Sequence, residues 1–361
     1  MKNKKVLIIA IVAVVAVLAV VLGVVLGGGN QTPDTTTTTT TKPAPAPATE
    51  KEYKLGMGAV AGGHDNKQAN LTIATVVLDD AGKIVACRLD VAQNKYAVDG
   101  EEIEFTVRES KRELLERYNM KNASPIKKEW YEQAEAFEAW VVGKTGAEVA
   151  ELLKKDNLVQ SGTHWVSNDP VLKAGCTIDV QDFRDAVVKA CNDDQGVEFK
   201  TSKTFKLGLG VNSENDKSSA ENEENFTIKM NVEFAGSVVV DGKVIASVND
   251  AYQPNIVVED GAVTLATVGT FANDEDKNKT FMTKRELMET YGMKVANIDK
   301  GGSKGSEEWY VQSEVYSSYV VGKTASEIAG LALNDDLMNA GCTIYIGGIN
   351  AVVAESVNNA R

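Results

Sequence analysis

Residues 128–145 read KEWYEQAEAFEAWVVGKT, and residues 307–324 read EEWYVQSEVYSSYVVGKT. The second stretch repeats the Trp-Tyr-x-Gln opening and the Val-Val-Gly-Lys-Thr ending of the first. Trp130, Phe137, Trp140 and Val141 fall at helical spacing, which predicts a helix with one apolar face. Gly143 suits a left-handed end to this helix, and Thr145 with Glu148 predicts a capping box that opens another helix. The chain therefore carries a helix–turn–helix unit twice.

The Gly-Lys-Thr ending of this unit also occurs in phosphate-binding loops. Such a loop needs a further glycine earlier in the turn, so that bare backbone amides can surround a phosphate. Glu138 and Ser317 stand at that position in the two copies. The sequence thus favours a structural corner over a nucleotide site.

Composition sets the size and the charge of the folded part. With 361 residues, 43% hydrophobic and 25% charged, the chain can form two ordinary domains. A formal charge of −13 argues against nucleic acid and anionic lipid as partners of these domains. The 4 cysteines are too few for a disulfide scaffold, and no spacing of Cys and His resembles a metal site.

The N-terminus predicts a membrane anchor. Lys2, Lys4 and Lys5 precede an apolar run at residues 6–26, which is long enough to cross a bilayer as a helix. We therefore predict an uncleaved, single-pass transmembrane segment within residues 1–29, with the rest of the chain outside the cytoplasm at the cell membrane. A cleaved signal peptide is the alternative. Residues 30–50, rich in Thr and Pro, predict an extended linker.

The rest of the chain predicts two tandem repeated α+β domains, at residues 51–192 and 204–361, joined by a linker at 193–203. Each begins with strands that include a hairpin, whose turns are expected at residues 79–82 and 241–242. Helices follow, and then residues 174–180 or 340–346 are predicted as a strand that leads into a last helix. The acidic residues 212–225 are expected to form an exposed loop. Strands followed by helices are typical of the α+β class.

The closing segments carry a resemblance to a known family. Ala174-Gly175-Cys176-Thr177-Ile178, with the Ala/Val-rich helix that follows, resembles the closing motif of FMN-binding domains. Ala340-Gly341-Cys342-Thr343-Ile344 repeats it. The hairpins with Asp-x-Gly-Lys-Ile or Asp-Gly-Lys-Val turns, and the predicted anchor, are similar to membrane-anchored, tandem-domain electron-transfer flavoproteins of Gram-positive bacteria.

The resemblance implies a cofactor and a site. In that family the motif threonine carries FMN through a phosphoester made by a flavin transferase, which corresponds to Thr177 and Thr343 here. Gly175, Gly341, Cys176 and Cys342 would complete the cofactor site, with FMN bound covalently or non-covalently. The resemblance implies a cell-surface redox carrier, rather than a self-contained enzyme, that exchanges electrons with membrane quinone-linked partners.

The sequence is also compatible with two other classes of function. The first is an extracytoplasmic ligand- or partner-binding surface protein that keeps the flavin-domain fold without the cofactor. In that case the Ala-Gly-Cys-Thr-Ile segment only packs in the core, with cysteine as a small apolar residue. The second is a hydrolase, for which the sequence offers no Ser–His–Asp or Cys–His arrangement.

Overall fold

The computed structural model describes residues 49–62, 68–99, 102–107, 109–153, 158–161, 164–220, 226–259, 262–268, 282–299 and 307–361. The predicted anchor at residues 1–29 lies outside this part of the chain, as does nearly all of the predicted linker at 30–50. Among the helices described, none combines the length and the apolar character needed to cross a bilayer.

The first half, residues 51–203, is built on an antiparallel sheet with the strand order β4-β3-β2-β1-β7. The predicted hairpin is confirmed: its turn is closed by Asp79, whose Oδ1 accepts hydrogen bonds from the backbone nitrogens of Ala81 and Lys83 at 3.0 and 2.9 Å. Part of the predicted linker is a strand, since β7 pairs with the start of β1. The strands are β1 (Lys51–Gly62), β2 (Gln68–Asp79), β3 (Ile84–Asp99), β4 (Glu102–Val107) and β7 (Val197–Thr201).

The second half, residues 204–361, has a sheet in which β9 pairs with β8 on one side and with β10 and β11 on the other. Asp241 and Gly242 join β9 to β10 with φ of 52° and 77°, as a tight primed turn requires. The expectation of a loop at residues 212–225 is wrong for its first part, because β8 pairs with β9 as far as Ala220. The strands are β8 (Lys206–Ala220), β9 (Phe226–Val240), β10 (Lys243–Tyr252), β11 (Pro254–Glu259) and β12 (Ala262–Val268).

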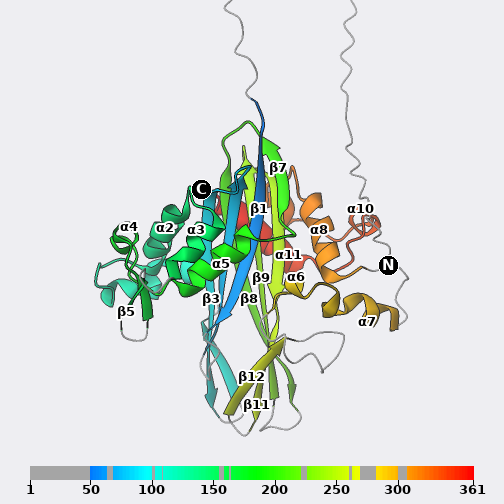
Figure 1. Ribbon diagram of the computed structural model, residues 1–361. Helices are drawn as coiled ribbons and strands as arrows, with labels where there is room; N and C mark the ends of the chain where they lie inside the picture. Colours follow the sequence, from blue (N-terminus) through cyan, green and yellow to red (C-terminus); the bar gives the residue numbers. More distant parts are fainter. Residues whose placement is uncertain are drawn as a thin grey trace, which may run out of the picture. The chain divides into compact units, whose positions relative to one another are not determined.

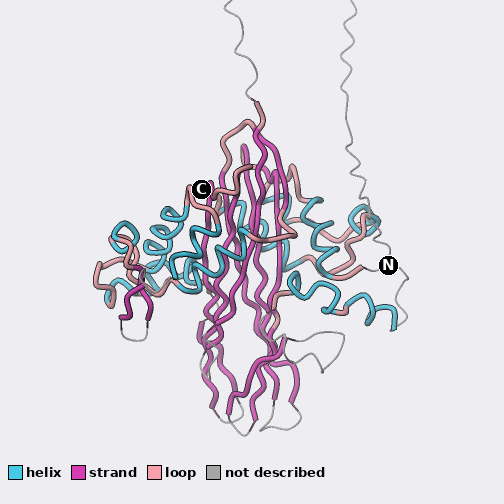
Figure 2. The backbone as a smooth tube through the Cα atoms, in the orientation of Figure 1, coloured by secondary structure: helices cyan, strands magenta, loops and turns pink. Residues whose placement is uncertain are grey.

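The helices lie on the outer faces of the two sheets, with the strands in the middle (Figures 1 and 2). The prediction of the α+β class is confirmed. The first half contains α1 (Lys111–Leu114), α2 (Trp130–Val141), α3 (Gly146–Ala150), α4 (Pro170–Lys173) and α5 (Gln181–Cys191), with a small hairpin of β5 (Leu158–Ser161) and β6 (His164–Ser167). The second contains α6 (Lys284–Leu287), α7 (Met293–Asp299), α8 (Trp309–Tyr319), α9 (Ala325–Ala329), α10 (Asp335–Asn339) and α11 (Gly347–Asn358).

The repeated Val-Val-Gly-Lys-Thr corner is structural, as predicted. Gly143 has φ of 84°, and the capping box of Thr145 with Glu148 opens α3. Two backbone hydrogen bonds join the corner to the start of β3: Gly143 N donates to Ile84 O at 2.8 Å, and Ile84 N donates to Lys144 O at 2.9 Å. The Gly143 N–H is therefore not available to a phosphate. Gly322 and Lys323 make the equivalent bonds to Val244.

The predicted strands at residues 174–180 and 340–346 are wrong. Each segment is a turn between a short helix and the last helix, α4 to α5 or α10 to α11. In the first half, the backbone nitrogen of Cys176 donates to Leu172 O at 2.7 Å, and that of Thr177 donates to a side chain of α2. The small and apolar residues resemble a strand in sequence, but their backbone groups find partners outside any sheet.

One hydrophobic cluster is shared by the two halves. It joins Leu55 and Ile73 of the first sheet to Leu207, Phe234 and other buried residues of the second. The two sheets therefore pack face to face, and each has its own helix-covered cluster on the opposite face. The division into two domains stays a prediction, but the halves are not separated by solvent.

Glycines in β1 and β8 let the last helix of each half lie directly on its sheet. A Cβ at Gly58 would lie 2.4 Å from Ala186 O of α5, and a Cβ at Gly208 would lie 1.7 Å from Ser356 O of α11. The paired Gly-x-Gly motifs thus serve close packing of helix on strand.

Gly208→Ala is expected to lower the free energy of unfolding by about 1–3 kcal/mol or more, because the methyl group can be accommodated only if α11 moves. Gly330→Ala is the control, since its Cβ would meet nothing closer than 3.6 Å. That variant should change stability by no more than about 0.5 kcal/mol. Equal effects of the two substitutions in urea unfolding would contradict this packing.

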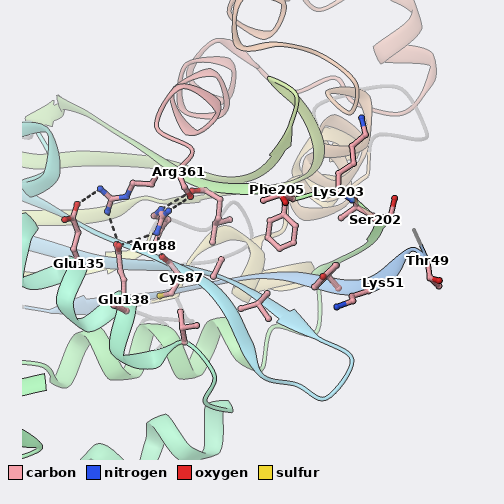
Figure 3. A pocket seen from close by; sticks show the side chains of 18 residues that line it. Thr49, Lys51, Cys87, Arg88, Glu135, Glu138, Ser202, Lys203, Phe205 and Arg361 are labelled. Carbon is pink, nitrogen blue, oxygen red and sulfur yellow. Dashed lines mark hydrogen bonds and ion pairs between the residues drawn. The ribbon is translucent and has the colours of Figure 1, made fainter. Parts of the chain in front are cut away.

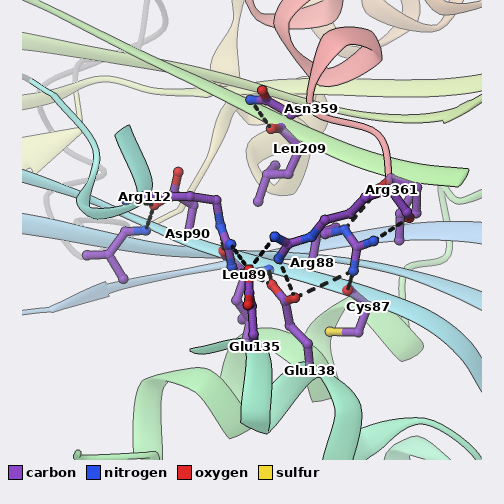
Figure 4. A network of polar contacts seen from close by, with 12 residues as sticks. Cys87, Arg88, Leu89, Asp90, Arg112, Glu135, Glu138, Leu209, Asn359 and Arg361 are labelled. Carbon is purple, nitrogen blue, oxygen red and sulfur yellow. Dashed lines mark hydrogen bonds and ion pairs between the residues drawn. The ribbon is translucent and has the colours of Figure 1, made fainter. Parts of the chain in front are cut away.

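Polar contacts also join the halves. Glu138 of α2 is 4% exposed, and its carboxylate meets Arg88, Arg112 and Arg361 at 3.5, 2.7 and 3.0 Å (Figure 4). Arg361 belongs to the second half, and Arg88 donates from Nε to Leu207 O of the second half at 3.0 Å. A further contact between the halves lies on α5, where Lys189 pairs with Glu286 of the second half at 2.7 Å.

The position on α11 that matches Lys189 holds a carboxylate, Glu355. It shares a cavity wall with Glu113 and Asp90 of the first half, and its Oε2 accepts from Val211 N at 3.1 Å. Burial raises the pKa of Glu355 to about 7, and the carboxylates of Glu113 and Asp90 add to the rise. Because the folded pKa exceeds the ordinary value of 4.5, the folded state binds more protons between these two values. The contribution of Glu355 to stability should then fall as pH rises from 4.5 through about 7.

Glu355→Gln is therefore expected to stabilise the protein by about 1–2 kcal/mol at alkaline pH, and to lose this advantage below the ordinary pKa of the carboxyl group. Thermal unfolding of both proteins across that range measures the effect. Glu198→Gln, at an exposed position of β7, is the control. An advantage that does not vary with pH would contradict the assignment.

Candidate functional site

The predicted cofactor threonine of the first half is held by a buried glutamine. Gln133 of α2 is 0% exposed, and its Oε1 accepts from both Thr177 N at 2.9 Å and Thr177 Oγ1 at 3.2 Å. The amide of Gln133 donates to Lys128 O at 3.1 Å. Gln133 thereby fixes the turn before α5. The repeated Trp-Tyr-x-Gln motif was the available signal for this role, which the sequence analysis missed.

The second half repeats this arrangement. Gln312 Oε1 accepts from Thr343 N at 2.7 Å and from Thr343 Oγ1 at 3.1 Å. Gly341 has φ of 108°, a left-handed value that favours glycine. Gly175 differs, because a Cβ there would lie 2.5 Å from the Cβ of Ala136 on α2. Glycine is thus required for close packing at position 175 and for its backbone conformation at position 341.

The two motif cysteines lie in the core. Cys176 and Cys342 are both 0% exposed. Burial raises the pKa of the Cys176 thiol to about 12 and also raises that of Cys342. Both side chains are therefore protonated thiols near neutral pH, unsuited to nucleophilic attack or to metal ligation. Within the described residues, no group of three or more Cys, His, Asp or Glu side chains could hold a metal ion.

Thr177 borders a cavity of about 600 Å³ that opens between the first sheet, α1, α2 and the start of α5. This volume lies in the range of about 300–1,000 Å³ that cofactor sites occupy. Its wall combines aromatic, apolar and polar side chains, among them Asn70, Thr72, Gln93, Lys111, Tyr118, Trp130, Gln133, Ile178, Asp179, Asp182 and Phe183. Of the predicted site residues, Thr177 lines this cavity, whereas Gly175 and Cys176 do not.

Lys111 places a positive charge in this wall. Its Nζ lies 5.2 Å from the centre of the Tyr118 ring and 5.6 Å from that of Trp130, which is the geometry of a cation–π contact. Burial lowers the pKa of Lys111 to about 8; Lys95 contributes, while Asp90 and Asp182 oppose the change. Lys284 stands in the same way over Tyr291 and Trp309, at 5.3 and 5.2 Å. The repeated Lys-Arg-Glu-Leu sequence could have indicated this lysine.

Two carboxylates line the same cavity at the start of α5. Asp179 accepts from Gln181 N at 2.9 Å and from Trp165 N at 3.1 Å. Burial raises the pKa of Asp182, and the neighbouring carboxylates of Asp179 and Asp185 add to the rise. The aromatic walls and Lys111 fit the ring system of a flavin. A phosphate at this helix start, however, would meet negative charge.

The second half differs from the first at two matched positions. Glu233 of β9 stands where Thr72 stands in β2, and Gly348 of α11 stands where Asp182 stands in α5. A Cβ at Gly348 would lie 1.6 Å from Glu233 Oε2, so the carboxylate rests against the first turn of α11. Burial raises the pKa of Glu233, and Lys284 opposes the rise. Each half thus has one of its own carboxylates at the start of its last helix, α5 or α11.

A second cavity, of about 780 Å³, lies beside the junction of the two halves (Figure 3). It is lined by Arg88, Glu135, Glu138 and Arg361, whose charges pair with one another. Lys203, also in this wall, pairs with Asp241. These charges are paired within the protein, so they are less available to a ligand than Lys111 in the cavity beside Thr177.

The comparison with curated proteins found a partial similarity. The chain is similar to a protein named chlorophenol reductase from Desulfitobacterium hafniense, with 33% identity over 108 residues. The match covers 26% of this chain and 32% of that protein, so the chain spans about a third of the relative's length. No family model matches the chain, and no solved structure matches it.

Proposed function

We propose that the chain is a redox protein that carries a flavin in the cavity beside Thr177. The observation that carries the proposal is the position of this motif threonine on the wall of a cavity with aromatic sides and a cationic group. The partial similarity to a protein named as a reductase supports a role in electron transfer. A bound flavin would supply the redox chemistry, and the residues of the cavity would orient it and set the charge around it.

The cellular setting belongs to the same proposal. Residues 6–26 would anchor the chain in the cell membrane, with both halves outside the cytoplasm. Membrane quinone-linked proteins would supply the electrons, and a flavin transferase would load FMN if attachment is covalent. We also propose that the halves are tandem copies of one domain, supported by their matching hairpins, corners and Thr–Gln contacts.

The alternative is a binding protein of the same fold without a cofactor. The contacts of Thr177 and the acidic start of α5 favour this alternative over covalent attachment. The hydroxyl of Thr177 already bonds to Gln133, and Asp179 would repel an incoming phosphate.

Intact mass separates these possibilities. The full chain is co-expressed with a flavin transferase, and the masses of the wild type, Thr177→Ala and Thr343→Ala are compared. Covalent attachment predicts one FMN increment, less water, for each loaded threonine, removed by the matching substitution. A non-covalent flavin predicts no increment, but flavin released on denaturation. If neither an increment nor released flavin is found, the binding-protein alternative replaces the proposal.

A further inference from the structure

The start of α5 already holds a carboxylate of the chain itself, Asp179. A helix N-terminus attracts phosphate because its first backbone N–H groups are unpaired. Here Asp179 Oδ1 accepts from Gln181 N at 2.9 Å, and its Oδ2 accepts from Trp165 N at 3.1 Å. The chain's own carboxylate therefore stands where the resemblance would place the flavin phosphate.

A second carboxylate reinforces this charge. Asp182, the second residue of α5, lines the cavity, and its Oδ2 would lie 3.2 Å from a Cβ at Gly62. The second half also has a carboxylate at the start of its last helix, but this carboxylate belongs to Glu233 of β9, which lies against Gly348 of α11. Two different residues thus supply the same negative charge at the helix start of the two halves.

The remaining polar groups of the cavity suit a neutral ring. Among the described residues, no oxygen accepts a hydrogen bond from the Lys111 ammonium, which rests on the rings of Tyr118 and Trp130. Asn70 Oδ1, also in this wall, is buried and has no hydrogen-bond partner in the described part of the chain. A donor and an acceptor are thus left for a ligand beside aromatic side chains. Unmatched buried groups of this kind normally have a partner in a native protein.

We propose that this cavity recognises the ring of a flavin and rejects its phosphate, so that riboflavin is a better ligand than FMN. The inference rests on the proposed function and specifies its ligand. Lys111 would donate to a ring carbonyl, Asn70 would accept from a ring N–H, and Asp179 with Asp182 would disfavour a phosphorylated side chain. Isoalloxazine carries both kinds of group on one edge.

Titration of the full-length chain with riboflavin and with FMN tests the proposal, since the two ligands differ only by the phosphate. Binding is followed by quenching of flavin fluorescence at low ionic strength, where charge repulsion is least screened. Riboflavin is expected to bind at least tenfold more tightly than FMN. Asp182→Asn should reduce the difference in affinity between riboflavin and FMN, mainly by improving FMN binding. Asp185→Asn is the matched control: Asp185 lies on the same helix, pairs with Arg184 and does not line the cavity.

Lys111→Met should weaken binding of both ligands, because it removes a contact to the ring that they share. Tighter binding of FMN than of riboflavin would overturn the inference while leaving the proposed function intact. An affinity ratio of riboflavin to FMN that Asp182→Asn leaves unchanged would also overturn the inference. Covalent FMN on Thr177 would overturn it as well. Binding of neither ligand would overturn the inference and the proposed function together.

Discussion

Replacing Arg285 by methionine is expected to lower the free energy of unfolding by about 3–5 kcal/mol, because it leaves a buried charge without its partner. Arg285 meets Asp193 through two nitrogens, at 3.2 and 3.3 Å. The two side chains are 6% and 8% exposed. The guanidinium also donates to Gln195 O at 2.8 Å, and Asp193 accepts from Met57 N at 3.0 Å. The pair connects the second half to the chain that leaves α5 of the first.

Arg117→Met is the control for this substitution. Arg117 pairs with Glu109 at 2.7 Å, but the side chains are 64% and 49% exposed. Exposed pairs contribute about 0–1 kcal/mol, so this variant should unfold almost as the wild type does. Removing both partners, as Arg285→Met with Asp193→Leu, should recover part of the loss, because no unpaired charge remains. Similar losses for Arg285→Met and Arg117→Met in urea unfolding would contradict the burial of the pair.

Phe234→Ala is expected to cost about 3–5 kcal/mol and to destabilise both halves at once. Phe234 of β9 is 0% exposed in the cluster that the two sheets share. If this cluster couples the halves, the cavity left by Phe234→Ala in the second half should also lower the unfolding midpoint of the first half. Two halves with independent cores would respond separately.

Tryptophan fluorescence can report on the first half alone. Of the 4 tryptophans, Trp130, Trp140 and Trp165 lie in the first half and Trp309 in the second. In a Trp309→Phe background, the remaining fluorescence follows the first half. Phe234→Ala in that background should move the fluorescence midpoint together with the midpoint from circular dichroism. An unchanged fluorescence midpoint would show that each half unfolds by itself.

Local patterns predicted much of the fold. The hairpin turns and the capping boxes were predictable because each depends on a few neighbouring residues, such as Asp79 with Gly82 and Thr145 with Glu148. The burial of Trp130 and Phe137 followed from helical spacing. The strand β7 was missed because its pairing with β1 spans most of the first half.

Non-local contacts explain what the sequence could not predict. Period-2 patterns indicate that a strand has a buried face, but they do not say that the other half of the chain covers it. Residues 174–180 resemble a strand because they are small and apolar, yet the backbone amide of Thr177 bonds to Gln133 on a distant helix. Likewise, Lys111 enters the candidate site only because the fold brings α1 and the start of α5 to the same cavity.

The visible absorption spectrum of the purified full-length chain shows directly whether the protein binds a flavin. The chain is produced with and without a co-expressed flavin transferase, exposed to excess flavin, and separated from free ligand by gel filtration. We expect isoalloxazine bands to remain with the protein and to be diminished by Lys111→Met. A protein that stays colourless after every treatment would contradict the assignment of a flavin to the cavity beside Thr177.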